Sequence, residues 1–539
     1  KYIKDIINIR YVVVLAKIIK PKTFLYIAVT SIISFSFSLS ATTNFTPDDA
    51  SLNKYEAPTW FNNAKFGIFL HWGINSQIAY NGWYSRWMYY QETPDKKKLP
   101  DWAAGSYSHH VRTFGHPSEV GFKDLIPLWT AENWQPNELV ALFKQAGAKY
   151  IVPTAAHHDN FDNYDSSYQP WNSVNMGPKR DVMREWQQAT KKHGLYFGAS
   201  SHTARSWMFN QDAYSSDSTG PKKGVPYDGN LTQADGKGLW WQGYNPKDLY
   251  EANINGDNKP TDEFLKRWEL RVTELYDKYD LDLLYFDGLG YQLEQPYKNV
   301  IAGFYNSNQK KNNGKLTAVV NIKNPIDPKA VIGDYEKGVA KEIQPYPWQT
   351  DTTLSSWFYI KDRDMSEITK PASVMVDMLA DIVSKNGNLL LNVALKGDGS
   401  LPDNQRQELV KIGQWLEVNG EAIYGTKPWE VFGEGPTKAI EGHYKEFTKK
   451  DKSYTSEDIR FTQKNGAIYA IVLSKPENHQ VLVKNLAINS TLEKRSISKV
   501  SLLGSDESIH WSRTSQGLAI TFPEDHSGEY AHSFKIEFK

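Results

Sequence analysis

The fold is indicated most clearly by the stretch Phe264-Leu-Lys-Arg-Trp-Glu-Leu-Arg-Val-Thr-Glu-Leu-Tyr-Asp-Lys-Tyr-Asp-Leu-Asp-Leu-Leu-Tyr-Phe-Asp-Gly288. Its first part carries apolar residues at the spacing of a helix, namely Phe264, Trp268, Val272, Leu275 and Tyr279. The almost wholly apolar run Leu281–Phe286 then predicts a buried strand, and Asp287 stands directly after it. A helix followed by a buried strand is the repeating unit of a parallel α/β fold.

The same alternation extends from this unit toward both ends of the chain. Strands are predicted at 66–70, 150–154, 194–198, 316–320 and 388–392, and helices at 138–146 and 181–193. Repeated units over roughly 370 residues fit a (β/α)8 barrel of the TIM type, placed at residues 50–428. A doubly wound open sheet is the alternative, but it would carry a Gly-rich phosphate loop after its first strand, and none follows residues 66–70.

After about residue 430 the pattern changes to short strands separated by turn residues. Such runs occur at 467–473, 480–483, 497–503, 518–522 and 534–538, and Lys464-Asn465-Gly466 is a hairpin signal. No helical period intervenes, so residues 429–539 are predicted to form a small antiparallel β-sandwich. The charged segment 439–456 is expected to be an exposed loop or insertion.

The N-terminus has the pattern of a secretory signal. Residues 1–22 are rich in Lys and Arg, residues 23–47 carry no charge, and a small-x-small exit ends near Ala41. Residues 1–41 are therefore predicted to be a signal peptide, and the mature protein to be exported, either periplasmic or secreted. A membrane anchor is the alternative, although the apolar run is short and Ser-rich for a span. The true start of the chain is left open, because the sequence opens with Lys1.

Composition limits the partners that the chain can have. Lys plus Arg and Asp plus Glu both number 62, so net charge gives no reason to expect nucleic acid or an anionic membrane as a partner. The absence of cysteine removes disulfides, thiolate metal sites and a Cys nucleophile. The 18 Trp and 31 Tyr fill core and also suit a sugar cleft, because aromatic faces pack on pyranose rings. No stable membrane partner is expected after signal cleavage, and the oligomeric state is left open.

Candidate functional residues stand where the predicted strands end, because the active site of a barrel lies at those ends. They are His71-Trp72-Gly73, His157-His158-Asp159, Asp287, and the pair Asn321 and Lys323. Histidines, an aromatic residue and a carboxylate are thus predicted to converge on one mouth, which packing alone does not explain.

Asp287 suits the nucleophile of a retaining glycosidase. That reaction needs two carboxyl groups about 5–5.5 Å apart, one ionised for attack and one protonated for the leaving oxygen. His157 and His158 are sequence neighbours that would point in opposite directions from an extended chain, which makes them poor joint metal ligands. A metal-dependent hydrolase that uses these histidines with His71 and Asp159 is kept as an alternative, which loss of activity with a chelator would support.

Several blocks of the chain together resemble the α-L-fucosidases of glycoside hydrolase family 29. The resemblance runs from about residue 55 to 430 and rests on Trp60–Gly73, Trp83–Met88, Ala155–Phe161, Gly177–Asp181, Leu284–Gly288, Gly387–Val393, Asp398–Gly399 and Asn419–Trp429. It implies a barrel with a C-terminal β-sandwich, no cofactor or metal, and release of terminal α-linked L-fucose from fucosylated glycans with retention. It carries over Asp287 as nucleophile, His71, His157 and His158 as ligands of fucose hydroxyls, and Trp83 as an aromatic wall.

Two segments depart from the family pattern. Family members often have an acidic residue just before the tryptophan matched by Trp83, where this chain has Gly82, so one fucose hydroxyl would be held differently. The segment after Gly198 also varies within the family, and here His202 and Trp207 are predicted to line the pocket.

The acid/base is predicted to be Glu336, because it follows the short strand-like run Ala330–Ile332. Glu342 is the runner-up, and Asp334 is left open as well. The polar and aromatic stretch that ends at Trp357 is expected to border the site, with Trp357 in contact with substrate.

Two further functions are compatible with these residues. A non-catalytic sugar-binding protein would keep the histidines and aromatic residues but lack a carboxyl partner for Asp287. A glycosidase of the same mechanism could instead cleave α-L-galactosides, whose sugar differs from L-fucose by a hydroxyl on C6. The natural glycan and its linkage are not indicated by the sequence.

Overall fold

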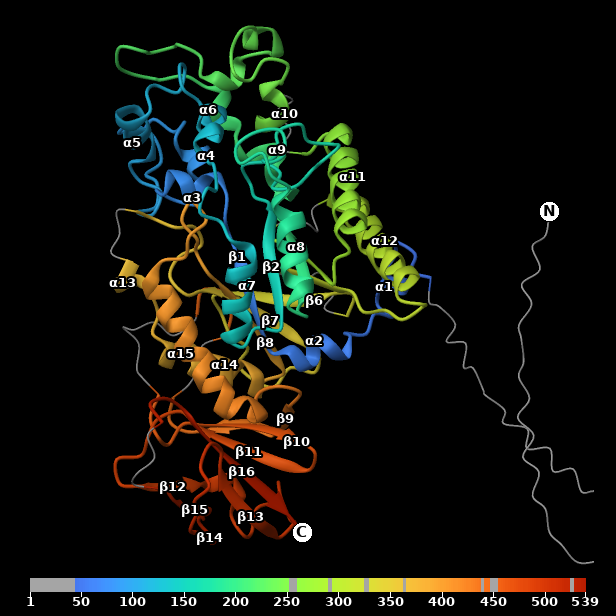
Figure 1. Cartoon of the computed structure of the whole chain (residues 1–539), viewed down its shortest axis with the longest axis vertical. Coiled ribbons are helices and arrows are strands. Elements are labelled where there is room, and N and C mark those ends of the chain that lie inside the picture. The colour runs from blue at the N-terminus through green and yellow to red at the C-terminus, as the bar shows by residue number, and fades with distance from the viewer. Residues whose placement is uncertain are drawn as a thin grey trace, which may run out of the picture. The chain divides into compact units, whose positions relative to one another are not determined.

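The computed structural model describes residues 44–251, 259–288, 293–323, 329–361, 365–437, 441–445, 454–523 and 528–539. Eight strands, each parallel to its neighbours, form a closed barrel in which β8 pairs with β1 (Figure 1). They are β1 (Phe66–Leu70), β2 (Tyr150–Ala156), β3 (Tyr196–Ser201), β4 (Leu283–Phe286), β5 (Val319–Lys323), β6 (Ile332–Glu336), β7 (Trp348–Thr353) and β8 (Gly387–Asn392). The predicted TIM-like barrel is confirmed.

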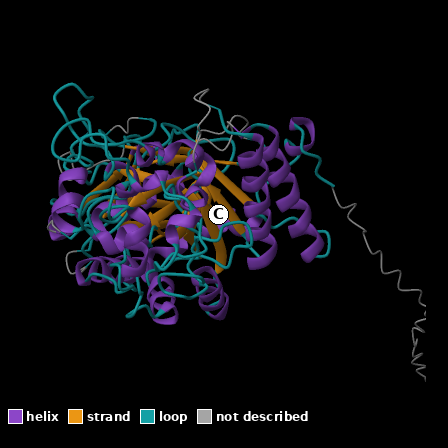
Figure 2. Ribbon diagram, turned by 90° about the horizontal axis from the view of Figure 1, so that it is seen from above, coloured by secondary structure: helices purple, strands orange, loops and turns teal. Residues whose placement is uncertain are grey.

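Helices surround these strands (Figure 2). They are α1 (Asp49–Leu52), α2 (Thr59–Ala64), α3 (Ile74–Ile78), α4 (Tyr84–Trp87), α5 (Ser106–Thr113), α6 (Phe122–Leu125), α7 (Pro136–Gln145), α8 (Val182–Lys192), α9 (Ser206–Phe209), α10 (Pro246–Tyr250), α11 (Asp262–Tyr279), α12 (Gln295–Lys311), α13 (Met365–Ile368), α14 (Ala372–Ser384) and α15 (Asp403–Asn419). The alternation is incomplete, because residues 337–347 connect β6 to β7 without a helix.

The unit formed by α11 and β4 places a carboxylate at the barrel mouth. The helix begins after Thr261, whose hydroxyl oxygen accepts a hydrogen bond from the backbone N–H of Phe264 at 3.1 Å. It ends at Asp280, which adopts the left-handed conformation with φ of 47°. The apolar stripe predicted from the sequence is buried, and so is every residue of β4. Asp287 therefore directly follows the carboxyl end of a strand that is packed on both faces.

Strand β7 shows why part of the barrel was not predicted. Its sequence, Trp-Gln-Thr-Asp-Thr-Thr at 348–353, is mainly polar, yet all six residues are buried. Gln349 accepts a hydrogen bond from the Tyr150 hydroxyl at 2.9 Å, and the Thr350 hydroxyl donates to the carbonyl of Gly338 at 2.8 Å. Polar residues can form a buried strand where the rest of the barrel satisfies their hydrogen bonds. Strands β3 and β5 were predicted, but they begin two and three residues later than the sequence pattern indicates.

The C-terminal part of the chain forms two antiparallel sheets, as predicted. One has the strand order β13-β16-β11-β10-β9 and the other β12-β15-β14. The strands are β9 (Lys427–Glu434), β10 (Ile459–Lys464), β11 (Ala467–Val472), β12 (Gln480–Val483), β13 (Ile497–Leu502), β14 (Trp511–Arg513), β15 (Leu518–Thr521) and β16 (His532–Phe538). The predicted boundary between residues 428 and 429 falls inside β9. Arg460 on β10 donates to Asp381 on α14 at 2.6 Å, which ties this sheet to the barrel.

The predicted signal peptide, residues 1–41, lies outside the described residues, as does most of the predicted loop at 439–456. Within the described part of the chain, no helix combines the length and the apolar character that crossing a bilayer requires.

Candidate active site

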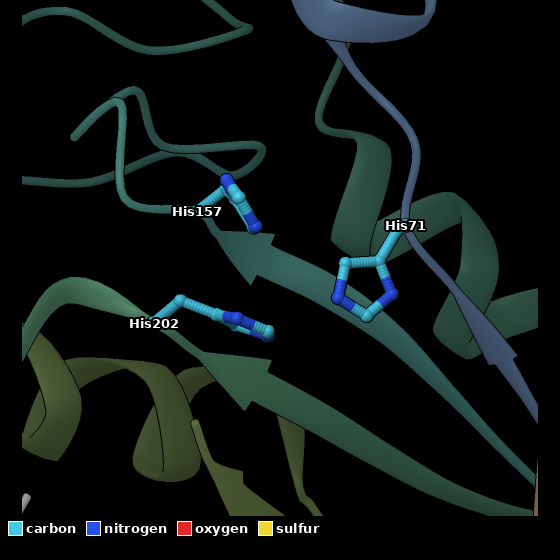
Figure 3. A group of neighbouring side chains, drawn as sticks. All are labelled: His71, His157 and His202. Atoms are coloured by element: carbon cyan, nitrogen blue, oxygen red, sulfur yellow. The ribbon is translucent and has the colours of Figure 1, made fainter. Parts of the chain in front are cut away.

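Four histidines gather where the first three barrel strands end. His71 follows β1, His157 and His158 follow β2, and His202 follows β3. The rings of His71, His157 and His202 point toward a common space (Figure 3). The centroid of the His202 ring lies 5.0 Å from that of His71 and 4.9 Å from that of His157. The structure therefore brings together His71, His157 and His158, which were predicted from strand ends, and His202, which was predicted from the segment after Gly198.

Three of these imidazoles are held neutral by burial. Burial lowers the pKa of His71 and of His157 well below the ordinary value for histidine, and it lowers the pKa of His202 as well. Nδ1 of His71 lies 2.8 Å from Oδ1 of Asn392, and Nε2 of His202 lies 2.9 Å from the hydroxyl of Ser200. A neutral imidazole donates from one ring nitrogen and accepts at the other. Because Oδ1 of Asn392 can only accept, Nδ1 of His71 carries the proton and Nε2 is left to accept a hydrogen bond from a hydroxyl group.

The same nitrogens are the atoms that could hold a metal ion. One group comprises His71, His157 and His202, another comprises His158, His202 and Asp287, and within each the candidate ligand atoms lie within 4.8 Å of one another. His157 and His158 fall into different groups, in line with the prediction that they are poor joint ligands. Their ring centroids are nevertheless 4.6 Å apart, because the chain turns after β2 instead of staying extended.

Asp159 stabilises the turn that carries His157 and His158. Its two carboxylate oxygens accept from the side-chain amide of Asn75 at 3.0 Å and from the backbone N–H of Phe161 at 3.2 Å. Burial raises the pKa of Asp159 to about 7. The turn is also tied to α11, where buried Arg271 donates to Asp162 at 2.6 Å. These bonds fix the loop after β2, and with it the positions of the histidines.

Asp287 has its carboxylate among positive and polar groups. Its Oδ1 lies 2.5 Å from Nζ of Lys323, and its Oδ2 lies 3.2 Å from Nε2 of His158 and 3.1 Å from Nδ1 of His202. Burial alone would raise the pKa of Asp287, but Lys323 and the two histidines hold it well below the ordinary value for aspartate. Asp287 is therefore ionised at neutral pH, which suits a nucleophile.

Lys323, the last residue of β5, links Asp287 to Glu336. Its Nζ lies 2.5 Å from Oδ1 of Asp287 and 3.0 Å from Oε2 of Glu336, so these two oxygens are no more than 5.5 Å apart. Glu342, the runner-up, is exposed, and its charge acts on Lys385, which precedes β8 at the other end of the barrel. The structure thus brings Glu336, not Glu342, to Asp287.

A pair of carboxyl groups lies deeper in the barrel. Asp351 on β7 accepts from the Tyr285 hydroxyl at 3.0 Å and lies 3.3 Å from Nζ of Lys323. Asp334 on β6 accepts from the side-chain amide of Gln349 at 2.7 Å. Burial and the neighbouring Asp351 raise the pKa of Asp334 well above the ordinary value, so Asp334 is protonated. Because Asp334 is enclosed below the mouth, it is a poorer candidate than Glu336 for protonating a bound ligand.

Trp83 and Trp357 are the two predicted wall residues that the structure places beside the histidines. The centroid of the Trp83 ring lies 5.5 Å from that of His158, and the centroid of the Trp357 ring lies 4.9 Å from that of His71. Nζ of Lys323 lies 5.5 Å from the Trp357 ring centroid. The two tryptophans thus pack against His158 and His71, and Trp357 also lies close to Lys323.

Phe358 is a wall residue that sequence reasoning missed. Its ring centroid lies 4.9 Å from that of His157. A Cβ atom added to Gly82 would lie 2.8 Å from Cδ2 of Phe358. The Phe358 ring therefore fills the space beside Trp83 into which a side chain at position 82 would project. No pattern around Phe358 in the sequence indicates this contact.

Trp207 is buried in α9, and among the ring contacts of the described residues none joins it to the four histidines. Phe209, at the end of the same helix, packs instead against His158, with 5.0 Å between ring centroids, and against Trp83, with 5.2 Å. A place for Trp207 in the pocket stays a prediction.

Comparison with known sequences finds relatives along most of the chain. A family model described as alpha-L-fucosidase matches residues 32–421, and a model of the alpha-L-fucosidase C-terminal domain matches residues 451–537. Tissue alpha-L-fucosidase of Mus musculus is 29% identical over 494 residues, which cover 89% of this chain and 91% of the relative. Plasma alpha-L-fucosidase of Homo sapiens is 27% identical over 499 residues, with 89% of each chain covered.

Solved structures are similar over the same extent. The Thermotoga maritima alpha-fucosidase in complex with fucose has a TM-score of 0.68 at 27% identity, with 91% of this chain and 100% of that chain covered. A Bacteroides thetaiotaomicron alpha-L-fucosidase has a TM-score of 0.58 at 18% identity, which is a likeness of fold.

Proposed function

The chain belongs to the α-L-fucosidase family of glycoside hydrolases, and we propose that it is an exo-enzyme that removes terminal α-linked L-fucose from oligo- or polysaccharides with retention. The observation that carries the mechanism is the pair Asp287 and Glu336, whose nearest oxygens flank Lys323 no more than 5.5 Å apart. Retaining glycosidases place their carboxyl groups about 5–5.5 Å apart, whereas inverting enzymes need roughly 6.5–9.5 Å to admit a water molecule.

In the first step, a carboxylate oxygen of Asp287 attacks the anomeric carbon of fucose. The bond from that carbon to the glycosidic oxygen breaks, and Glu336 transfers its proton to the departing oxygen. The low pKa of Asp287 keeps it ionised for this attack. The product of the step is a fucosyl ester of Asp287.

In the second step, Glu336 acts as a base. It takes a proton from a water molecule, the water oxygen bonds to the anomeric carbon, and the ester bond to Asp287 breaks. Two inversions at one carbon restore the original configuration, so the first product is α-L-fucose.

The histidines supply hydrogen bonds to the sugar. His71 and His157 have lowered pKa values and enter the site as neutral rings, which form hydrogen bonds with hydroxyl groups without adding charge. Trp83, Trp357 and Phe358 offer apolar surface for the C–H faces and the methyl group of fucose. This mixture of aromatic walls and a few polar groups is typical of a sugar pocket.

A screen of nitrophenyl glycosides, with proton NMR of the first product, tests the proposal. The α-L-fucoside should be hydrolysed fastest, and the α-L-galactoside about 10- to 100-fold more slowly, because a site rejects an added hydroxyl only weakly. The α anomer of fucose should appear before mutarotation. A β anomer as first product would contradict retention, and failure to cleave any glycoside would favour a non-catalytic sugar-binding protein.

Replacing Lys323 by methionine should shift the pH dependence of fucoside hydrolysis. Lys323 lowers the pKa of Asp287, so its removal raises that pKa and brings protonation of the nucleophile into a higher pH range. The acidic limb of kcat/KM should move upward by about 1–3 pH units. Lys337→Met is the control, because the Lys337 ammonium lies 5.4 Å from the centroid of the Trp357 ring and its loss should move the limb less. An acidic limb that stays in place in Lys323→Met would contradict the assigned role.

Export remains part of the proposal. The basic and then uncharged N-terminal residues support a signal peptide, and a periplasmic or secreted enzyme would meet the glycans of its surroundings.

A further inference from the structure

A short segment of the C-terminal part of the chain reaches the barrel mouth. Residues 441–445, here called the outer loop, lie between β9 and β10 in the sequence. The backbone N–H of Gly442 donates to the carbonyl of Val339 at 3.1 Å, and that of Tyr444 donates to the carbonyl of Glu336 at 2.8 Å. The outer loop thus pairs with the segment that leaves β6, directly beside the proposed acid/base.

This contact is close and specific. A Cβ atom on Gly338 would lie 2.1 Å from the carbonyl oxygen of Gly442, so the approach requires a glycine at position 338. Nδ1 of His443 accepts from the backbone N–H of Glu336 at 2.9 Å, and the ring centroid of His443 lies 5.5 Å from that of Tyr335. Backbone and side-chain contacts together fix the outer loop on the end of β6.

The side chain of Tyr444 lies on the solvent side of Glu336. Burial and the nearby Glu336 carboxylate raise the pKa of the Tyr444 hydroxyl, so this hydroxyl lies near the Glu336 carboxyl group, whose Oε2 is 3.0 Å from Nζ of Lys323. Tyr444 is nevertheless 67% exposed. An exposed aromatic ring whose own backbone N–H is bonded to the residue that donates the proton is well placed to meet whatever is attached to the leaving oxygen.

We propose that Tyr444 forms the binding subsite for the leaving-group sugar, a pyranose ring whose glycosidic oxygen is protonated by Glu336. The inference rests on the proposed fucosidase function and deepens it. Since Glu336 must touch the glycosidic oxygen, the second sugar extends from that oxygen toward solvent, where the outer loop holds the exposed Tyr444 ring. The exposed ring face packs on the apolar C–H face of a pyranose. The C-terminal part of the chain thus takes part in choosing the glycan.

The test compares two substrates that share fucose and differ in the leaving group. One is a disaccharide of L-fucose α-linked to a hexopyranose, and the other is α-L-fucosyl fluoride, whose leaving group is a single atom. In Tyr444→Ala, kcat/KM for the disaccharide should fall at least about 10-fold, while kcat/KM for the fluoride should stay within about 3-fold of the wild type. Tyr444→Phe keeps the ring and should retain most of the disaccharide activity.

Tyr346→Ala is the matched control. Tyr346 is also an exposed tyrosine, but it lies two residues before β7, at the opposite end of the barrel from Glu336. This variant should have the same kcat/KM as the wild type on both substrates. Equal losses on both substrates in Tyr444→Ala, no loss on either, or a Tyr444→Phe variant as weak as Tyr444→Ala would overturn the subsite. A wild type that cleaves neither compound would instead refute the fucosidase function itself.

Discussion

Replacing Asp287 by alanine should lower kcat on an aryl α-L-fucoside by about 10⁴-fold or more, as the loss of a covalent nucleophile does in other enzymes. Asp287 is partly buried and ionised, and Lys323, His158 and His202 hold its carboxylate in place, so its removal takes away the group that would form the ester. Steady-state kinetics on a nitrophenyl fucoside measure the loss. An unchanged circular dichroism spectrum would show that the fold is intact.

Azide gives this experiment its control. A small anion can enter the space that the Asp287 carboxylate leaves and attack the anomeric carbon from the same face. The single displacement forms a carbon–nitrogen bond, expels the aryl leaving group and yields β-L-fucosyl azide, with inverted configuration. If the folded variant gives no azide product, Asp287 is not the nucleophile.

Replacing Glu336 by alanine should have the second-largest effect, and the effect should depend on the leaving group. A fucosyl disaccharide needs a proton on its departing oxygen, and its kcat/KM should fall by about 10²–10⁴-fold. An aryl fucoside with an acidic phenol departs without that proton, so its kcat/KM should fall much less. Comparing both substrates in wild type and variant measures the difference.

Glu342→Gln is the matched control for this prediction. Glu342 is exposed, and its charge acts on Lys385 near the start of β8. Its loss should therefore leave kcat/KM unchanged on both substrates. Equal losses on the disaccharide and the aryl fucoside in Glu336→Ala would assign the proton transfer to a different group.

Local sequence patterns were sufficient to predict most of the barrel. The helical stripe that begins at Phe264 and the apolar run that ends at Phe286 are local signals, and the structure has a helix and a strand there. Strand β7 was missed because its burial depends on hydrogen bonds from residues far away in the chain, such as Tyr150 to Gln349. Pattern reasoning fails where a distant residue satisfies a polar side chain.

The candidate site divides in the same way. His71 and Asp287 were predicted because each follows an apolar strand, and a parallel barrel brings all such positions to one mouth. The packing of Phe358 against Gly82, and the link that Lys323 makes from Asp287 to Glu336, could not be predicted, because each joins segments whose distance is set by loops.

The sequence by itself determined that this chain forms a barrel followed by a β domain, and that histidines and a carboxylate stand at the strand ends. These features follow from the period of apolar residues, which any chain segment carries locally. The tertiary structure alone decided that Glu336, not Glu342, faces Asp287, and that Tyr444 comes back to the barrel from more than a hundred residues later in the chain. Such contacts depend on strand register and on long-range folding of loops, which a pattern of neighbouring residues does not contain.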